Sequence, residues 1–129
     1  MKMVVTLTKE GYTRVGTHIA SNFYGVSQDK IDYVENLKPI LKRVIENSDL
    51  HVVNSVYHQF EPYGVSAMIV LSESHLSIHT WPEKGAALID IFTCSIDGGG
   101  NHEEKAKKAL ELLIEELKPK EYECEILLR

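Results

Sequence analysis

Apolar residues recur at helical spacing between residues 36 and 47. They follow the i, i+3, i+4, i+7, i+8 series, which predicts an amphipathic helix with one apolar stripe formed by Leu37, Ile40, Leu41, Val44 and Ile45. Asn36 is the expected N-cap of this helix. It places Pro39 in the first turn, where the missing N–H costs no intrahelical hydrogen bond.

A second helix is predicted after residue 101. Asn101 is followed three residues later by Glu104, which is close to a capping box, and Pro119 ends the pattern. The apolar stripe of this helix consists of Ala106, Ala109, Leu110, Leu113 and Leu117. Each predicted helix therefore has a single apolar face to bury.

The remaining apolar residues indicate strands. Segments that are β-branched, aromatic or alternating are expected to be strands at 51–60, 65–71, 75–79, 87–94 and 122–128, and residues 4–23 are expected to be extended with turns. Three glycines at 98–100 end the 87–94 run. Within that run, Ile89 and Ile91 lie on one face, whereas Leu88 and Phe92 lie on the other.

This order of elements indicates an α+β fold. Clustered strands with two helices predict a two-layer sandwich, in which one mainly antiparallel sheet carries both helices on one face. The other face must meet solvent, a ligand or a partner chain. Because Leu88 and Phe92 are apolar, a bare solvent-facing sheet is disfavoured, and we expect a homodimer formed through that face.

The length and composition fit one globular domain. The chain has 129 residues, of which 43% are hydrophobic and 26% charged, so residues 1–129 are expected to form a single domain. A net charge of −5 argues against a nucleic-acid partner, and no apolar run is long enough to predict a membrane span. The start of the chain does not resemble a signal peptide, so the cytoplasm is expected, with Cys94 and Cys124 as free thiols.

Polar chemistry is densest at residues 71–83 (LSESHLSIHTWPE), which hold three serines, two histidines and two glutamates. A polar hairpin rim is the simplest interpretation. His75 and His79 are four residues apart, as on a zinc-binding helix. The alternating apolar residues predict a strand, however, and four residues of strand span about 13 Å, so no metal site is expected. A Ser-His-Asp hydrolase is disfavoured because the strand-to-helix elbow is missing.

The ordered motifs of the chain resemble those of the prokaryotic S-adenosylmethionine decarboxylases. The strongest similarity covers residues 60–94, with FEPYGVS at 60–66, the 71–83 segment, and IDIFTC at 89–94. Weaker agreement extends along nearly the whole chain and includes GTH at 16–18. A Glu-Ser-His core alone is a weak signal, but the ordered set with its spacings is specific.

The resemblance implies a proenzyme that cuts its own backbone between Glu73 and Ser74, giving chains 1–73 and 74–129. The Ser74 hydroxyl attacks the Glu73 carbonyl and forms an ester, a step that needs a distorted peptide and donors to the carbonyl oxygen. Elimination and hydrolysis then convert Ser74 into a pyruvoyl group, the implied cofactor. By the same resemblance, His79 is the base for elimination, and Ser66 assists the acyl shift.

The implied reaction is decarboxylation of S-adenosylmethionine for spermidine biosynthesis. The pyruvoyl carbonyl forms a Schiff base with the substrate amine and accepts electrons when carbon dioxide leaves. The resemblance assigns protonation of the resulting carbanion to Cys94 and substrate contacts to Phe60 and Glu83. Trp81 is either a further substrate contact or a core or hairpin residue. Cys124 matches no motif and is expected to be structural.

Two departures from the family pattern leave the substrate open. Ser95 follows Cys94 where bacterial members usually have glycine, and Gln59 stands where a basic residue is often found. The same pyruvoyl chemistry on arginine or ornithine is therefore an alternative, although the retained 60–64 run favours S-adenosylmethionine. An uncleaved homologue that binds a ligand or regulates a partner is a second alternative, which the presence of all the processing residues disfavours.

Overall fold

A computed structural model describes residues 2–7, 14–95 and 101–129 of the chain. The elements in chain order are β1 (Lys2–Leu7), β2 (Gly16–Tyr24), α1 (Gln28–Ile31), α2 (Val34–Asn47), β3 (Val52–Gln59), β4 (Val65–Leu71), β5 (Ser74–Trp81), the 3-10 helix η1 (Pro82–Lys84), β6 (Ala86–Cys94), α3 (His102–Leu117) and β7 (Glu121–Leu128). The glycine cluster at 98–100 lies outside the described residues, as do residues 8–13 of the segment expected to be extended.

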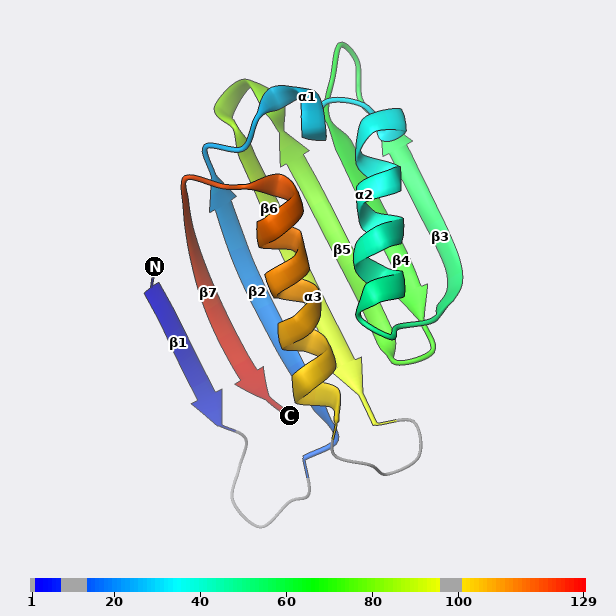
Figure 1. The fold of residues 1–129 in the computed structure, drawn as a ribbon, viewed down its shortest axis with the longest axis vertical. Coiled ribbons are helices and arrows are strands. Elements are labelled where there is room, and N and C mark those ends of the chain that lie inside the picture. Colours follow the sequence, from blue (N-terminus) through cyan, green and yellow to red (C-terminus); the bar gives the residue numbers. More distant parts are fainter. Residues whose placement is uncertain (1, 8–13, 96–100) are drawn as a thin grey trace.

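The described strands form one sheet of seven, in the order β1-β7-β2-β6-β5-β4-β3. β1 runs parallel to β7, and every other neighbouring pair is antiparallel. Strands β3 to β6 are consecutive both in the chain and in the sheet, whereas β7 returns from the end of the chain to lie between β1 and β2 (Figure 1). Local hairpins therefore build the half of the sheet that holds the 71–83 segment.

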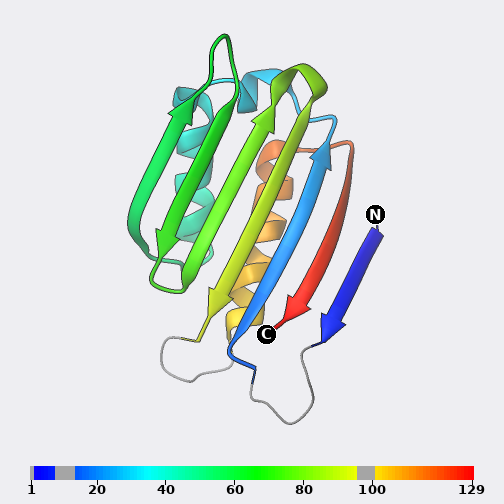
Figure 2. The same ribbon diagram turned by 180° about the vertical axis from the view of Figure 1, so that it is seen from behind.

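Helices α2 and α3 cover one face of the sheet (Figure 1), and the view from behind shows the strands in front of them (Figure 2). The core lies between these layers and includes the fully buried side chains of Ile19, Phe23, Leu41, Ile78 and Leu113. Burial of each such side chain stabilises the fold by about 1.5–3 kcal/mol. This arrangement confirms the predicted α+β sandwich with a mainly antiparallel sheet and two helices on one face.

Helix α2 begins earlier than the sequence pattern predicted. Its N-cap is Tyr33 rather than Asn36. Asp32 Oδ1 accepts hydrogen bonds from the Tyr33 N–H (2.9 Å) and from Asn36 Nδ2 (2.8 Å), so Asn36 supports the preceding turn instead of capping the helix. Pro39 consequently lies inside the helix, where it cannot donate to the carbonyl of Glu35. The apolar stripe was predicted correctly, since all of its residues are buried.

Helix α3 begins where it was predicted to begin, but without the side-chain cap. Asn101 occupies the N-cap position, and its side chain makes no capping hydrogen bond. Its backbone carbonyl instead accepts the N–H of Lys105 at 3.1 Å. Helix α1 was not predicted, because four residues are too few to reveal a helical period.

The sheet face opposite α2 and α3, which we call the open face, exposes apolar side chains. Val56 on β3, Met68 on β4 and Leu88 on β6 have exposed fractions of 64%, 46% and 37%. The alternation of side chains along β6 also directs Cys94 toward the open face. Within the described part of the chain no layer covers this face, which is consistent with the expected partner chain.

Candidate active site

The turn between β4 and β5 contains the predicted cleavage site. Leu71 pairs with Ser74 across the two strands, so Ser72 and Glu73 form a two-residue hairpin turn. Ser74 has a backbone φ of +144°, which a residue with a side chain rarely adopts. Such a conformation costs on the order of 1–3 kcal/mol and persists only where neighbouring contacts enforce it. The distortion that cleavage requires is therefore present at Ser74.

Contacts from the end of β6 hold the peptide bond between Glu73 and Ser74. Ser74 pairs with Thr93 on β6. The backbone N–H of Cys94 donates to the Glu73 carbonyl oxygen at 2.6 Å, and the Ser74 hydroxyl donates to Cys94 Sγ at 2.9 Å. The carbonyl that would be attacked thus already accepts a short hydrogen bond, which is how enzymes stabilise charge developing on such an oxygen.

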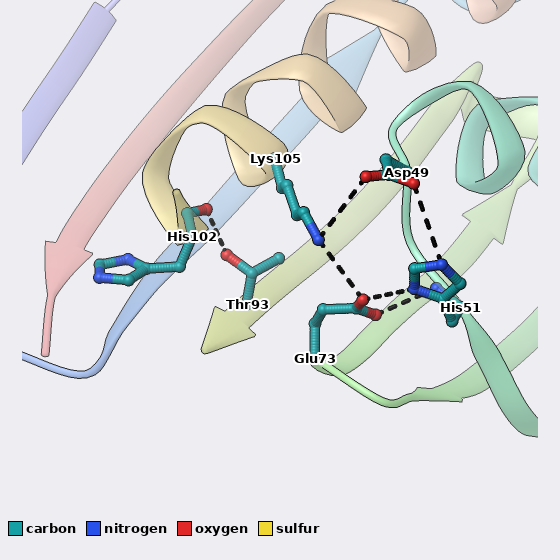
Figure 3. A network of polar contacts seen from close by, with 6 residues as sticks. All are labelled: Asp49, His51, Glu73, Thr93, His102 and Lys105. Atoms are coloured by element: carbon teal, nitrogen blue, oxygen red, sulfur yellow. Dashed lines mark hydrogen bonds and ion pairs between the residues drawn. The ribbon is translucent and has the colours of Figure 1, made fainter. Parts of the chain in front are cut away.

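The side chain of Glu73 points inward and is held from several sides (Figure 3). Only 1% of Glu73 is exposed. The His51 backbone N–H donates to Oε1 at 3.0 Å, His51 Nδ1 lies 2.7 Å from Oε2, and Lys105 Nζ lies 3.6 Å from Oε2. Burial opposes the charged form, but the hydrogen bonds from the His51 ring and backbone outweigh it and lower the pKa of Glu73. The carboxylate is therefore charged at neutral pH.

Ser66 and His79 form a second group of predicted residues. They are opposite one another on β4 and β5, and Ser66 Oγ lies 2.7 Å from His79 Nδ1. Both border a pocket of about 300 Å³ whose wall also includes Phe60 and Glu83, the two predicted substrate contacts. Trp81 lines the same pocket and is 39% exposed, so the structure favours the interpretation of Trp81 as a pocket residue rather than a core residue.

Within one chain these two groups remain separate. Ser74, Glu73 and Cys94 lie where β5 begins, whereas His79 lies five residues further along the same strand. Five residues of strand span about 17 Å, which is too far for His79 to touch residue 74. The structure therefore brings together each half of the predicted site, but a single chain does not join the halves.

Sequence reasoning missed the residues that surround the Glu73 carboxylate. His51 is the first residue of the predicted 51–60 strand, and Lys105 lies on a predicted helix, but neither belongs to a recognisable motif. Gln59, noted as a departure from the family pattern, has a structural role here. Its Oε1 accepts the Val34 N–H at 2.7 Å, and its Nε2 donates to the carbonyl of Asp32 at 3.0 Å, which fixes the start of α2.

The two cysteines differ in their surroundings. Cys94 is partly exposed beside Ser74, whereas Cys124 on β7 is buried, with its Sγ 3.1 Å from Ser21 Oγ. Burial raises the pKa of the Cys124 thiol, as fits a structural residue. Among the described residues, no group of histidines, cysteines and carboxylates is arranged to hold a metal ion. None of the described helices is both long enough and apolar enough to cross a membrane.

Comparison with known proteins gives a consistent result. The profile of a family described as S-adenosylmethionine decarboxylase matches residues 17–129. An S-adenosylmethionine decarboxylase proenzyme from a Sulfurihydrogenibium species is 47% identical over 106 residues, covering 82% of this chain and 75% of the relative. The proenzyme of the same name from Archaeoglobus fulgidus is 42% identical over 108 residues, covering 84% of this chain and 91% of the relative.

A solved structure agrees with the sequence relatives. The crystal structure of the adenosylmethionine decarboxylase from Aquifex aeolicus superimposes with a TM-score of 0.82 at 37% identity, covering 92% of each chain. The family match at residues 17–129 spans the turn between β4 and β5 and both halves of the predicted site, and the comparisons confirm the resemblance that the sequence motifs indicated. The chain belongs to the S-adenosylmethionine decarboxylase family.

Proposed function

We propose that this chain is a self-processing decarboxylase that converts S-adenosylmethionine into decarboxylated S-adenosylmethionine, the aminopropyl donor for spermidine synthesis. One observation carries the proposal. A strained serine, Ser74, follows a carbonyl that accepts a 2.6 Å hydrogen bond from the Cys94 N–H. The names of the relatives support the same substrate.

Processing starts from the Ser74 hydroxyl. Its oxygen adds to the Glu73 carbonyl carbon, the C–N bond breaks, and the nitrogen takes up the hydroxyl proton to become an amine, which leaves an ester. We assign assistance in this shift to Ser66. A base, which we assign to His79, then removes the α-hydrogen of residue 74, and the main-chain carboxylate of residue 73 leaves, so that residue 74 becomes dehydroalanine. Its methylene carbon takes up a proton to give an imine, which water hydrolyses to a ketone with release of ammonia.

The residues around Ser74 fit a pyruvoyl group made from that serine. Once formed, the group supplies a carbonyl that binds the substrate amine and accepts electrons as carbon dioxide leaves. The Cys94 thiol, 2.9 Å from the side-chain oxygen of residue 74, is suited to returning a proton to the substrate α-carbon. A catalytic thiol must stay reduced, so we propose the cytoplasm as the compartment.

We propose that Phe60 and Glu83 hold the nucleoside part of the substrate. Phe60 lines the pocket and is 47% exposed as a residue, so its ring can stack on adenine, and the Glu83 carboxylate can accept hydrogen bonds from the ribose hydroxyls. Both residues share the pocket with His79, so substrate binding and processing draw on the same half of the site.

We propose that the active unit is a homodimer of cleaved chains. His79 is too far from residue 74 of its own chain, yet both halves of the site border the open face. The apolar side chains of that face, such as Val56 and Met68, suit burial against a second copy. Antiparallel packing of two open faces brings each Ser66–His79 pair toward the cleavage turn of the other copy.

The direct test of the proposed function is carbon dioxide release from carboxyl-labelled substrates. We expect purified, processed protein to release carbon dioxide from S-adenosylmethionine and to leave arginine and ornithine unchanged. A Ser74→Ala chain, which cannot form the carbonyl, is the blank. Release from arginine or ornithine alone would assign the chain to another amino acid, and release from none of the three would favour the uncleaved binding homologue.

Replacement of Cys94 should separate processing from turnover. Cys94→Ala keeps the backbone N–H that contacts the Glu73 carbonyl, and Cys94→Ser also keeps a side-chain acceptor for the Ser74 hydroxyl. We expect both variants to be cut, because the backbone contact remains. Carbon dioxide release should fall by about a hundredfold or more, since a positioned acid contributes roughly that much. Normal turnover by both variants would remove Cys94 from the reaction.

A further inference from the structure

Four charged or titratable side chains meet behind the cleavage turn, on the side of the sheet that carries the helices (Figure 3). The buried Glu73 carboxylate is at the centre. His51, Lys105 and Asp49 surround it, and we call these three residues the Glu73 clamp. They come from two places in the chain: Asp49 and His51 from the segment between α2 and β3, and Lys105 from the first turns of α3.

His51 makes three contacts to the turn. Its carbonyl accepts the Ser72 N–H at 2.8 Å, its own N–H donates to Glu73 Oε1 at 3.0 Å, and its Nδ1 lies 2.7 Å from Glu73 Oε2. Because an ionised carboxylate can only accept, Nδ1 must carry the hydrogen. Both residues of the two-residue turn are thus tied to His51, one through its backbone and one through its side chain.

Lys105 places a positive charge beside the two carboxylates of the cluster. Its Nζ lies 3.6 Å from Glu73 Oε2 and 4.0 Å from Asp49 Oδ2, and its side chain is only 16% exposed. Asp49 Oδ1 in turn lies 3.9 Å from His51 Nε2. A carboxylate as deeply buried as that of Glu73 is costly without a cation, which Lys105 supplies. Thr93 Oγ1 donates to the carbonyl of His102 at 2.6 Å, which fixes the start of α3 against β6.

These contacts bear on the reacting atoms because the turn is short. The Glu73 side chain and the Glu73 carbonyl share one Cα atom, so a fixed side chain restricts rotation of the peptide. The carbonyl is held at its other end by the Cys94 N–H. If the side chain were released, the turn could relax the positive φ of Ser74 and carry the carbonyl away from both the hydroxyl and the N–H donor.

We propose that His51 and Lys105 are positioning residues for self-cleavage. They hold Glu73 so that its carbonyl carbon stays within reach of the Ser74 hydroxyl. The inference rests on the proposed function and adds residues that act before any cofactor exists. The step they favour is the acyl shift itself: the Ser74 oxygen bonds to the Glu73 carbonyl carbon, the peptide C–N bond breaks, and the hydroxyl proton moves to the nitrogen. No further reactant is needed.

The test is the rate of self-cleavage during cell-free translation, followed on denaturing gels. We expect His51→Ala and Lys105→Met to slow cleavage by about tenfold or more. Loss of one hydrogen bond of ordinary strength that favours the transition state slows a reaction by about this factor. His51→Asn keeps an N–H donor near the position of Nδ1, and Lys105→Arg keeps the cation, so both should recover most of the rate. Lys107→Met removes a lysine from the same helix whose ion pair, among the described residues, is with the half-exposed Glu103 at 3.1 Å, and this variant should cleave at the wild-type rate.

Two further measurements separate positioning from loss of folding. Each variant is also made with Ser74→Ala, and its folded fraction is measured by circular dichroism so that rates refer to folded chains. Hydroxylamine, which splits esters, is added to the uncut variants. We expect it to release few fragments, because the ester forms slowly. If the His51→Ala and Lys105→Met variants cleave at the full rate per folded chain, or if hydroxylamine releases abundant fragments from them, His51 and Lys105 are not positioning residues for the acyl shift. If the wild-type chain itself stays whole, the proposed function fails instead.

Discussion

Replacing Ser74 by alanine should leave a single chain of full length that releases no carbon dioxide. Alanine has no oxygen to attack the Glu73 carbonyl, so neither the ester nor the ketone can form. The wild-type chain of 14.6 kDa should instead separate into fragments 1–73 and 74–129. Intact mass spectrometry distinguishes the two outcomes, and it also reads the start of the second fragment, where a ketone replaces the amine of an ordinary serine terminus.

The neighbouring serine provides the matched control. Ser72 occupies the same two-residue turn, but Ser72 is exposed and contacts His51 through its backbone N–H. Ser72→Ala should therefore be cut at the wild-type rate and should keep full activity. If Ser72→Ala stays whole while Ser74→Ala is cut, the cleavage point lies elsewhere. If the wild-type fragment begins with a free amine, decarboxylation loses its electron acceptor.

Much of the fold could be predicted from the chain because its periodic patterns are clear. The 65–71 strand was predicted with the bounds that β4 has, and the stripes of α2 and α3 are buried as predicted. The failures were local. Asn36 has the right chemistry for an N-cap, but its amide bonds to Asp32, and the helix starts two residues before it. Competition between nearby polar groups is not visible in periodicity.

The separation of the two half-sites was predictable but not predicted. The strand spacing that keeps His75 and His79 from sharing a metal ion applies equally to Ser74 and His79, which are five residues apart on β5. The order of the motifs assigned all the site residues to a single site. The length of β5 shows that Ser74 and His79 cannot belong to one site within one chain. In the proposed homodimer, the apolar open face would therefore take part in the chemistry as well as in the assembly.

The clamp around Glu73 could not be predicted by the same means. Lys105 is one of several lysines on α3, and only the rotation of that helix against β6 turns it toward a carboxylate 32 residues earlier in the chain. The contact depends on packing, including the hydrogen bond from Thr93 to His102, and not on a local pattern. That Glu73 is buried and lies beside a strained serine can be recognised only from the folded turn.

Two inactive variants should restore cleavage when they are made together. His79→Ala alone should stay uncut because the base for elimination is lost, and Ser74→Ala alone should stay uncut because the nucleophile is lost. In a mixed dimer, the intact Ser74 of the His79→Ala chain faces the intact His79 of the second copy. We expect the His79→Ala chain, and no other, to be cut when both are co-expressed with tags of different mass.

The rescue is informative because the His79→Ala chain can obtain an intact His79 from the second copy alone. A site assembled within one chain could never be rescued, because each chain lacks an essential residue. A second chain that carries both Ser74→Ala and His79→Ala keeps any stabilisation by the partner but lacks the proposed base, so it should give no rescue. A Met68→Lys substitution in both chains should abolish the rescue, since it places a charge on the apolar open face through which we propose that the copies pack. Failure of co-expression to cut the His79→Ala chain would mean that the 17 Å gap between the half-sites (about five strand residues) is closed in some other way.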